Sequence, residues 1–287
     1  MVKHNKGDRQ SRNEGHTFVL VHGGWSGGWL WRYVAPALRE RGHVVTTPTL
    51  TGLGERRHLG NETATLSTHI EDIVAHIEME GFQDVTLVSH SYGGMVATGT
   101  LARIPDSIRS MIHLDAFVPE DGKSLIDCCS PERQAQYMIY KGEDRPVPPL
   151  PLSYFGITDP ALVDFITPKL VNQPWRTFFE PVKVIPRPSH VRMSYVRCAA
   201  NTVAEHFDRI MERVTRDPNV QTATIDTTHL CMLTVPLTDP FSLQNGYYGG
   251  EAGMKGPDKI PCSQVGRQIL LIVLSGVPSR ATEHRCG

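Results

Sequence analysis

The chain carries the stretch VTLVSHSYGGM at residues 85–95, and this stretch decides the fold. Its apolar start predicts a buried strand, and the two glycines near its end predict the beginning of a helix. Ser91 stands at the junction. A sharp strand-to-helix turn holds such a serine hydroxyl above the end of the strand, in an arrangement called a nucleophile elbow. Small residues belong two positions either side of the serine because the turn crowds them. Gly93 fits this rule, and Ser89 stands where glycine is usual.

Composition sets the outer limits on function. The 287 residues are 40% hydrophobic and 21% charged, which is ordinary for a globular protein with a large core. A net charge of -1 favours neither nucleic acid nor an anionic membrane surface as a partner. The six cysteines show neither metal-site spacing nor a compact disulfide framework. With no signal-peptide pattern and no apolar run of transmembrane length, we expect a cytoplasmic protein with reduced thiols.

Strand and helix patterns alternate along the first part of the chain. Strands are predicted at 17–21, 44–48, 85–90 and 111–116, and helices at 31–41, 68–80 and 93–103. A strand at 193–198, a helix with an apolar face near 203–214 and a strand at 220–225 follow later. Such alternation predicts a mostly parallel sheet with helices on both faces.

Changes in composition divide the chain into four parts. Residues 1–16 are polar and are expected to form a disordered leader. The core is predicted at 17–117 and 189–236. Between them, residues 118–188 are rich in proline and aromatic residues and are expected to form a helical lid insertion. Residues 237–287 show no good helix register and are expected to form an atypical C-terminal tail.

A serine nucleophile needs a base for its proton and donors for the oxyanion that forms. His229 is the expected base because it follows the last predicted strand, whereas His206 is expected at the surface of a helix. The oxyanion donors should be the backbone amide of Tyr92, which follows the serine, and one from the loop after the first strand, for which Gly24 is the candidate.

The third group, which orients the imidazole, has two candidates. The usual place, just after the strand at 193–198, holds Asn201, which is neutral and cannot stabilise an imidazolium by charge. Asp115, which ends the strand after the elbow helix, is the alternative. It can also be interpreted as a buried structural carboxylate that accepts backbone amides.

The sequence offers no site for a cofactor or a metal. The segment 52–57 begins like a dinucleotide fingerprint but has Arg57 in its last position. A HExxH motif or another metal-ligand spacing is not found in the sequence.

Four segments together resemble a known group of enzymes. FVLVHGGW at 18–25, TLTGLGER at 49–56, HSYGGM at 90–95 and LDAFVPEDG at 114–122 resemble microbial α/β-hydrolase carboxylesterases of the pyrethroid- and carbendazim-hydrolase group. The likeness to plant methylesterases and hydroxynitrile lyases is more distant. The resemblance to the carboxylesterases runs from about residue 18 to 236. It implies an α/β-hydrolase fold with a mostly parallel sheet and an inserted helical lid. Family members usually carry aspartate where Asn201 stands, and end in a helix where this chain has its tail.

The resemblance implies a serine esterase that cleaves small apolar or aromatic carboxylic esters through an acyl-enzyme. Trp25 and Trp29 are expected near the mouth of the substrate pocket. Two alternatives stay open. A non-catalytic, degenerate ligand-binding protein is suggested by Asn201 and the tail. A hydroxynitrile-lyase-type lyase is the other, although those lyases carry lysine where Leu230 follows the histidine.

Overall fold

The structure is a computed structural model that describes residues 15–59, 63–200 and 205–234. The expected tail at 237–287, Asn201 and all but the end of the expected leader at 1–16 lie outside the described residues.

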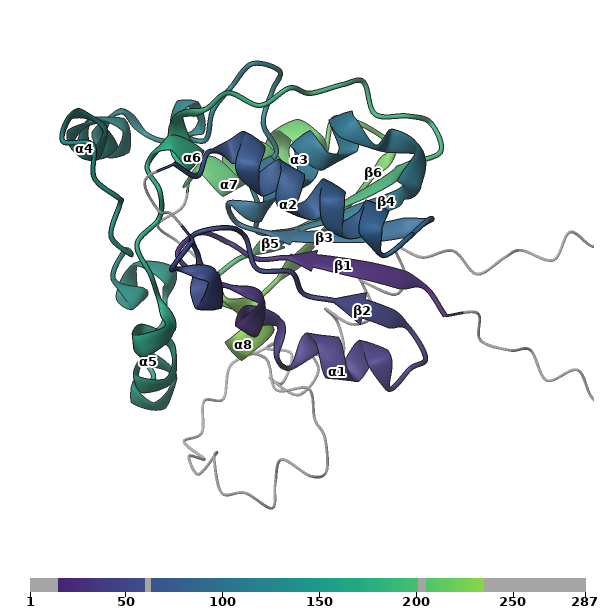
Figure 1. Cartoon of the computed structure of the whole chain (residues 1–287), viewed down its shortest axis with the longest axis horizontal. Coiled ribbons are helices and arrows are strands. Elements are labelled where there is room, and N and C mark those ends of the chain that lie inside the picture. The colour runs from purple at the N-terminus through teal and green to yellow at the C-terminus, as the bar shows by residue number, and fades with distance from the viewer. Residues whose placement is uncertain (1–14, 60–62, 201–204, 235–287) are drawn as a thin grey trace, which may run out of the picture.

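A parallel sheet organises the described part of the chain (Figure 1). Its strands are β1 (Thr17–Val21), β2 (Val44–Thr46), β3 (Val85–His90), β4 (Ile108–Leu114), β5 (Arg192–Cys198) and β6 (Val220–Ile225), in the order β2-β1-β3-β4-β5-β6. The helices around it are α1 (Val34–Arg39), α2 (Leu66–Met79), α3 (Gly93–Arg103), α7 (Glu205–Val214) and α8 (Cys231–Thr234). The prediction of a parallel α/β fold is therefore confirmed.

Two apolar cores lie on the two faces of the sheet. Because successive strand residues point to opposite faces, Val19 and Val21 of β1 join one core, and Phe18 and Leu20 join the other. Figure 1 shows α2, α3 and α7 on the first face and α1 and α8 on the second. This burial fixes the register of β1 between its neighbours, and with it the place of the loop that follows.

Two expected helices differ in their bounds for local reasons. The helix expected at 31–41 divides into a 3-10 turn at Gly28–Trp31 and the short α1. Pro36 explains the division, since proline lacks an amide hydrogen and fits only in the first turn of a helix. Helix α2 begins two residues before its expected start because Thr65 caps it: the Thr65 hydroxyl accepts a hydrogen bond from the Thr68 amide at 3.3 Å.

The named elements of the connection between β4 and β5 are helices and 3-10 turns. The helices are α4 (Pro131–Gly142), α5 (Pro160–Ile166) and α6 (Arg176–Phe179), with 3-10 turns among them. Ser130 caps α4 and Asp159 caps α5, and each cap is followed directly by a proline suited to the first turn. Figure 1 shows these helices at the end of the sheet where the strands have their carboxyl ends.

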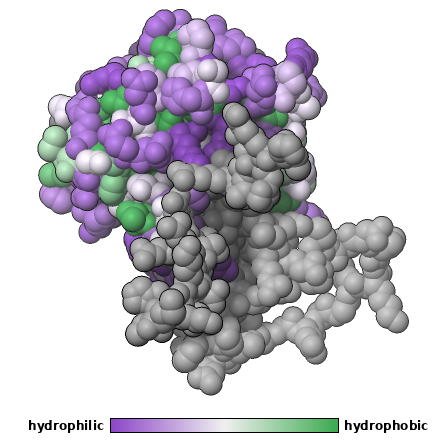
Figure 2. All heavy atoms as spheres, turned by 90° about the vertical axis from the view of Figure 1, so that its right-hand side faces the viewer, coloured by the Kyte–Doolittle hydropathy of each residue, from purple (hydrophilic) through white to green (hydrophobic). Residues whose placement is uncertain are grey.

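The opposite end of the sheet, where the strands have their amino ends, has a mostly hydrophilic surface (Figure 2). In Figure 2 the described atoms on the face toward the amino ends of the strands are mostly hydrophilic, with scattered apolar residues. Within the described ranges, the structure contains no helix with the length and apolar character needed to span a membrane.

Candidate active site

Ser91 lies in a strained turn between β3 and α3. Its φ angle is +52°, in a region that side-chain-bearing residues rarely adopt. The neighbouring backbone explains the two glycines that follow it. A Cβ on Gly93 would lie 2.6 Å from the carbonyl oxygen of His22, and a Cβ on Gly94 would overlap the carbonyl of Phe117. The turn therefore has the geometry that the sequence predicts for an elbow.

Ser89 is accommodated by a polar partner. Its side chain is fully buried, and its hydroxyl makes a 2.8 Å hydrogen bond with Nδ1 of His113 on the next strand. The serine thus fills a place usually held by glycine without leaving a buried hydroxyl unsatisfied.

Gly94→Ala is expected to destabilise the protein by about 3 kcal/mol, because the new methyl group meets backbone that cannot rotate away. Gly142→Ala is the matched control: it lies in α4 with open space around the new Cβ. It should change stability by less than about 1 kcal/mol. Urea unfolding of the three proteins measures both effects, and equal stability of the two variants would contradict the crowding.

His229 lies on the loop between β6 and α8, and its side chain is almost fully buried. Its Nδ1 makes a 2.7 Å hydrogen bond with Oδ2 of Asp115. Since a carboxylate only accepts, Nδ1 donates, and Nε2 is left with a lone pair. Phe155 and Phe207 stack nearly parallel to the imidazole, with ring centroids 5.1 and 5.3 Å from it. The ring is therefore fixed in both tautomer and plane.

Asp115 follows β4 and is completely buried, with a φ angle of +44°. Its two oxygens have different partners. Oδ2 faces His229, whereas Oδ1 accepts hydrogen bonds from the Arg197 guanidinium at 2.9 Å and from the Cys198 amide at 3.1 Å. Of the two sequence candidates for the third group, Asp115 contacts the histidine, and Asn201 lies outside the described residues.

Arg197 supplies the positive charge that a buried carboxylate requires. It bridges Asp115 and Asp208, and its side chain is only 6% exposed. Burial alone would lower the pKa of this guanidinium, but the hydrogen bond to Asp208 and the charge of Asp115 raise it above its usual value. Sequence analysis did not single out Arg197. A charged residue inside the buried strand β5 was the available signal.

The proposed oxyanion donors lie at the elbow and at the loop after β1. Within the described residues, the backbone hydrogen bonds of turns and loops use neither the Gly24 nor the Tyr92 amide. The side chain of Tyr92 has a different partner: its hydroxyl makes a 2.8 Å hydrogen bond with Nδ1 of His69 on α2. His90 makes a 2.9 Å hydrogen bond from Nε2 to the backbone oxygen of His229, and so supports the loop that carries the candidate base.

Three buried histidines surround this framework. Burial lowers the pKa of His22, His69 and His113 to about 4. His22 accepts a hydrogen bond at Nε2 from the Leu50 amide, 3.1 Å away, which a doubly protonated ring could not do. These rings therefore stay neutral in the folded protein.

The neutral histidines predict a steep loss of stability below pH 6.5. In the unfolded chain each of these three histidines binds a proton below about pH 6.5, whereas in the folded protein the three rings bind none until about pH 4. Unfolding thus binds protons between about pH 4 and 6.5. The free energy of unfolding therefore decreases by about 1.4 kcal/mol for each ring and each unit by which the pH is lowered in this window. Urea unfolding at pH 7, 6 and 5 tests this. His113→Gln should reduce the slope and the exposed His58→Gln should not; identical slopes would contradict the assignment.

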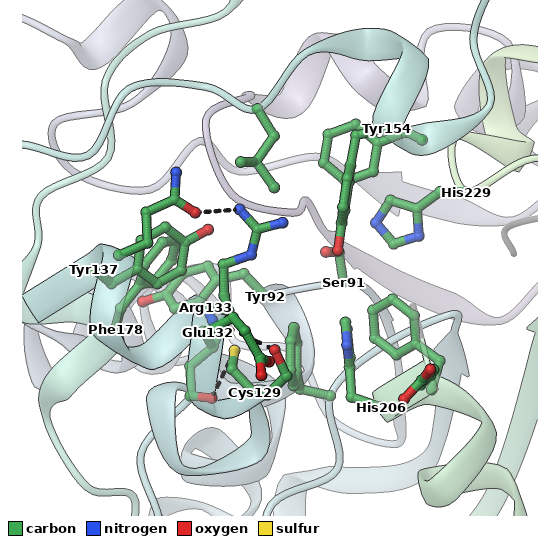
Figure 3. Close-up of a pocket in the computed structure, with 18 of the residues that line it drawn as sticks. Ser91, Tyr92, Cys129, Glu132, Arg133, Tyr137, Tyr154, Phe178, His206 and His229 are labelled. Carbon is green, nitrogen blue, oxygen red and sulfur yellow. Dashed lines mark hydrogen bonds between the residues drawn. The ribbon is translucent and has the colours of Figure 1, made fainter. Parts of the chain in front are cut away.

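Ser91 and His229 line a cavity of about 600 Å³ (Figure 3). Aromatic side chains form much of its wall: Trp25, Tyr137, Tyr154, Phe155, Phe178 and Phe207. Charged groups at 132, 133, 205 and 209 also reach it. Ser91 and His229 lie next to each other at one wall in Figure 3, and Arg133 extends toward the middle of the space.

Both tryptophans expected near the pocket line a space that Ser91 and His229 also line. Trp25 lines the main cavity and a smaller chamber of about 30 Å³, whereas Trp29 lines only the smaller of the two and packs edge-on against Phe165. His206 was expected at the surface, and this expectation is wrong. It lies in the first turn of α7, stacks on Phe117 at 5.0 Å and lines the cavity, and burial lowers its pKa to about 3.

Comparison with known proteins agrees with this fold. The sequence profile of the alpha/beta hydrolase family matches residues 18–239, which is most of the chain. The chain belongs to the alpha/beta hydrolase family. Among solved structures, this alpha/beta hydrolase resembles an extracellular alpha/beta-hydrolase from a Paenibacillus species. That match has a TM-score of 0.67 and 24% identity, and it covers 79% of this chain and 96% of the other.

Curated relatives of this alpha/beta hydrolase match over part of their length. A carbendazim hydrolyzing esterase from Nocardioides sp. is 55% identical over 125 residues, which are 42% of this chain and 52% of that protein. Methylesterase 18 of Arabidopsis thaliana is 32% identical over 123 residues, 40% of this chain and 47% of the relative. The chain thus spans about half the length of the curated relatives that it matches.

Proposed function

We propose that this alpha/beta hydrolase is a serine esterase that cleaves small apolar or aromatic carboxylic esters through an acyl-enzyme. The observation that carries the proposal is the 2.7 Å hydrogen bond between His229 Nδ1 and the buried carboxylate of Asp115, beside Ser91 in its strained turn. The bond leaves Nε2 as a base at the wall of a cavity that also holds the serine.

In the proposed reaction, Ser91 Oγ attacks the ester carbonyl carbon while its proton passes to Nε2 of His229. The amides of Gly24 and Tyr92 donate hydrogen bonds to the oxyanion. The bond to the alcohol then breaks, and His229 gives its proton to the leaving oxygen. Water attacks the acyl group with His229 as base again, and Ser91 leaves with the returned proton. Asp115 stabilises the positive charge on His229 in both halves.

The cavity supports the substrate class. A volume of about 600 Å³ with aromatic walls suits a small ring-containing ester. Tyr137, Tyr154 and Phe178 of these walls come from the β4–β5 connection, so we propose that residues 118–188 act as a lid on the core formed by 17–117 and 189–236. The name of the Nocardioides relative, which hydrolyses carbendazim, also favours a compact aromatic substrate.

Location and partners remain predictions from the sequence. Cys128, Cys129, Cys198 and Cys231 are free thiols in the described part of the chain, as expected for the cytoplasm. The proposed partner is a small ester alone, with no cofactor.

The test is hydrolysis of p-nitrophenyl acetate, butyrate and benzoate by the purified protein, followed by release of p-nitrophenolate. We expect saturable turnover of all three, and a burst of p-nitrophenolate where deacylation is slow. A folded protein that releases no product above the buffer rate from any of them would favour the ligand-binding alternative. Mandelonitrile is the comparison substrate for the lyase alternative, and we expect no cleavage of it, since Leu230 follows His229.

A further inference from the structure

Trp25 adopts a backbone conformation that residues with a bulky side chain rarely adopt. Its φ angle is +58°, although it is bulky and is not a glycine. Such strain persists only where surrounding contacts hold the residue in place. Trp25 directly follows Gly24, a proposed oxyanion donor, so whatever holds Trp25 also holds the neighbouring peptide.

The hydrogen bonds that hold Trp25 come from the β4–β5 connection. The backbone amide of Trp25 donates to Oε1 of Gln173 at 2.9 Å, and its carbonyl accepts from the amide of Val171 at 2.9 Å. Its indole nitrogen donates to the carbonyl of Val147 at 3.0 Å. Val147 and Gln173 are themselves paired by two backbone hydrogen bonds of 2.8 Å. A short paired segment of the connection therefore grips Trp25 at three points.

The orientation of the Gln173 amide is fixed by its second partner. Gln173 is completely buried, and its Nε2 donates to the Thr177 hydroxyl at 2.7 Å. That hydroxyl donates in turn to the carbonyl of Pro174 at 2.7 Å, so it can only accept from Gln173. The amide oxygen must then face the Trp25 amide. Such a chain of satisfied, buried hydrogen bonds holds a single geometry.

We propose that Gln173 is a positioning residue for the oxyanion hole. By accepting the Trp25 amide hydrogen, it sets the peptide that follows Gly24 and so holds Gly24 in the small chamber that Ser91 and His229 also line. Gln173 does not line the cavity itself. It therefore acts through the loop after β1, and it couples the packing of the connection to stabilisation of the transition state. This inference rests on the proposed esterase function.

A sulfur-substituted substrate separates this role from simple structural support. The carbonyl oxygen of an ester becomes a strong hydrogen-bond acceptor in the transition state, whereas the sulfur of the corresponding thionoester accepts only weakly. Damage confined to the oxyanion hole therefore reduces ester cleavage far more than thionoester cleavage. General loosening of the site reduces both alike.

The experiment compares Gln173→Met, which removes both side-chain hydrogen bonds at similar volume, with Gln173→Glu, which keeps an acceptor for the Trp25 amide. We expect Gln173→Met to lower kcat for p-nitrophenyl acetate about 10- to 100-fold, with KM within about twofold. The loss on the thiono analogue should be less than about threefold. Gln173→Glu should recover most of the ester activity.

Thr177→Val provides the intermediate case, because it frees the Gln173 amide without removing its oxygen; a smaller loss with the same ester preference is expected. An equal loss on ester and thionoester in the variants, or full ester activity in Gln173→Met, would overturn the inference. Both outcomes differ from failure of the proposed function, in which the wild-type protein itself cleaves no ester. If Gln173→Met does not fold by circular dichroism, Thr177→Val and Gln173→Glu decide the question with the same substrate pair.

Discussion

Ser91→Ala is expected to lower kcat on p-nitrophenyl acetate by about 10⁴- to 10⁶-fold, because the variant has no oxygen to form the acyl-enzyme. The loss should appear in kcat, with KM little changed, since the cavity walls stay in place. The substitution also removes no contact that stabilises the fold. The variant should therefore unfold at a urea concentration close to that of the wild type.

Ser89→Ala is the matched control for this variant. Ser89 lies two residues earlier in the same turn, is equally a serine, and bonds to His113. Its loss should reduce stability by about 1 kcal/mol and leave kcat within about threefold. Ester turnover that survives in Ser91→Ala, or falls equally in both variants, would exclude Ser91 as the nucleophile.

Asp115→Asn is expected to lower kcat by about 10⁴-fold. The structure gives a specific reason. Oδ1 of Asp115 accepts hydrogen bonds from Arg197 and Cys198, so the carbonyl oxygen of an asparagine must take that place. Its NH₂ group then faces Nδ1 of His229, which has to accept instead of donate. The proton moves to Nε2, the nitrogen that must receive the serine proton, and the base is lost.

Two further variants control this experiment. Asp208→Asn removes the exposed partner of Arg197 and leaves its contact with Asp115, so kcat should change by less than about threefold. Asn201→Asp introduces a carboxylate at the place usual in the resembling enzymes. Near-normal activity in Asp115→Asn, or a large gain in Asn201→Asp, would show that Asp115 is not the acid. Because Asp115→Asn removes one of the two negative charges that Arg197 contacts, its folding is checked by thermal unfolding.

Much of the fold could be predicted from local pattern alone. The helix at 93–103 and the strands at 17–21 and 220–225 coincide with the structure because turn residues or charged residues bound each segment on both sides. The helix expected at 31–41 was wrong in extent because the constraint came from one residue inside it, Pro36. Periodicity reports which face is apolar and says little about where the backbone can continue.

The site divides in the same way. Ser91 and His229 were predicted because the turn and the order along the chain leave few choices. The choice between Asp115 and Asn201 stayed open, since it depends on which side chain reaches Nδ1 of His229, a contact between residues 114 positions apart. Arg197 and Gln173 were missed for the same reason: each acts through partners that only the fold brings together.

The most direct test of the account is intact-protein mass spectrometry after reaction with a fluorophosphonate, followed by peptide mapping. The account predicts one phosphonyl group per molecule, attached at Ser91, with labelling slowed at least about 10³-fold in Asp115→Asn. A folded wild-type protein that gains no mass, or that carries the group on another residue, would contradict it.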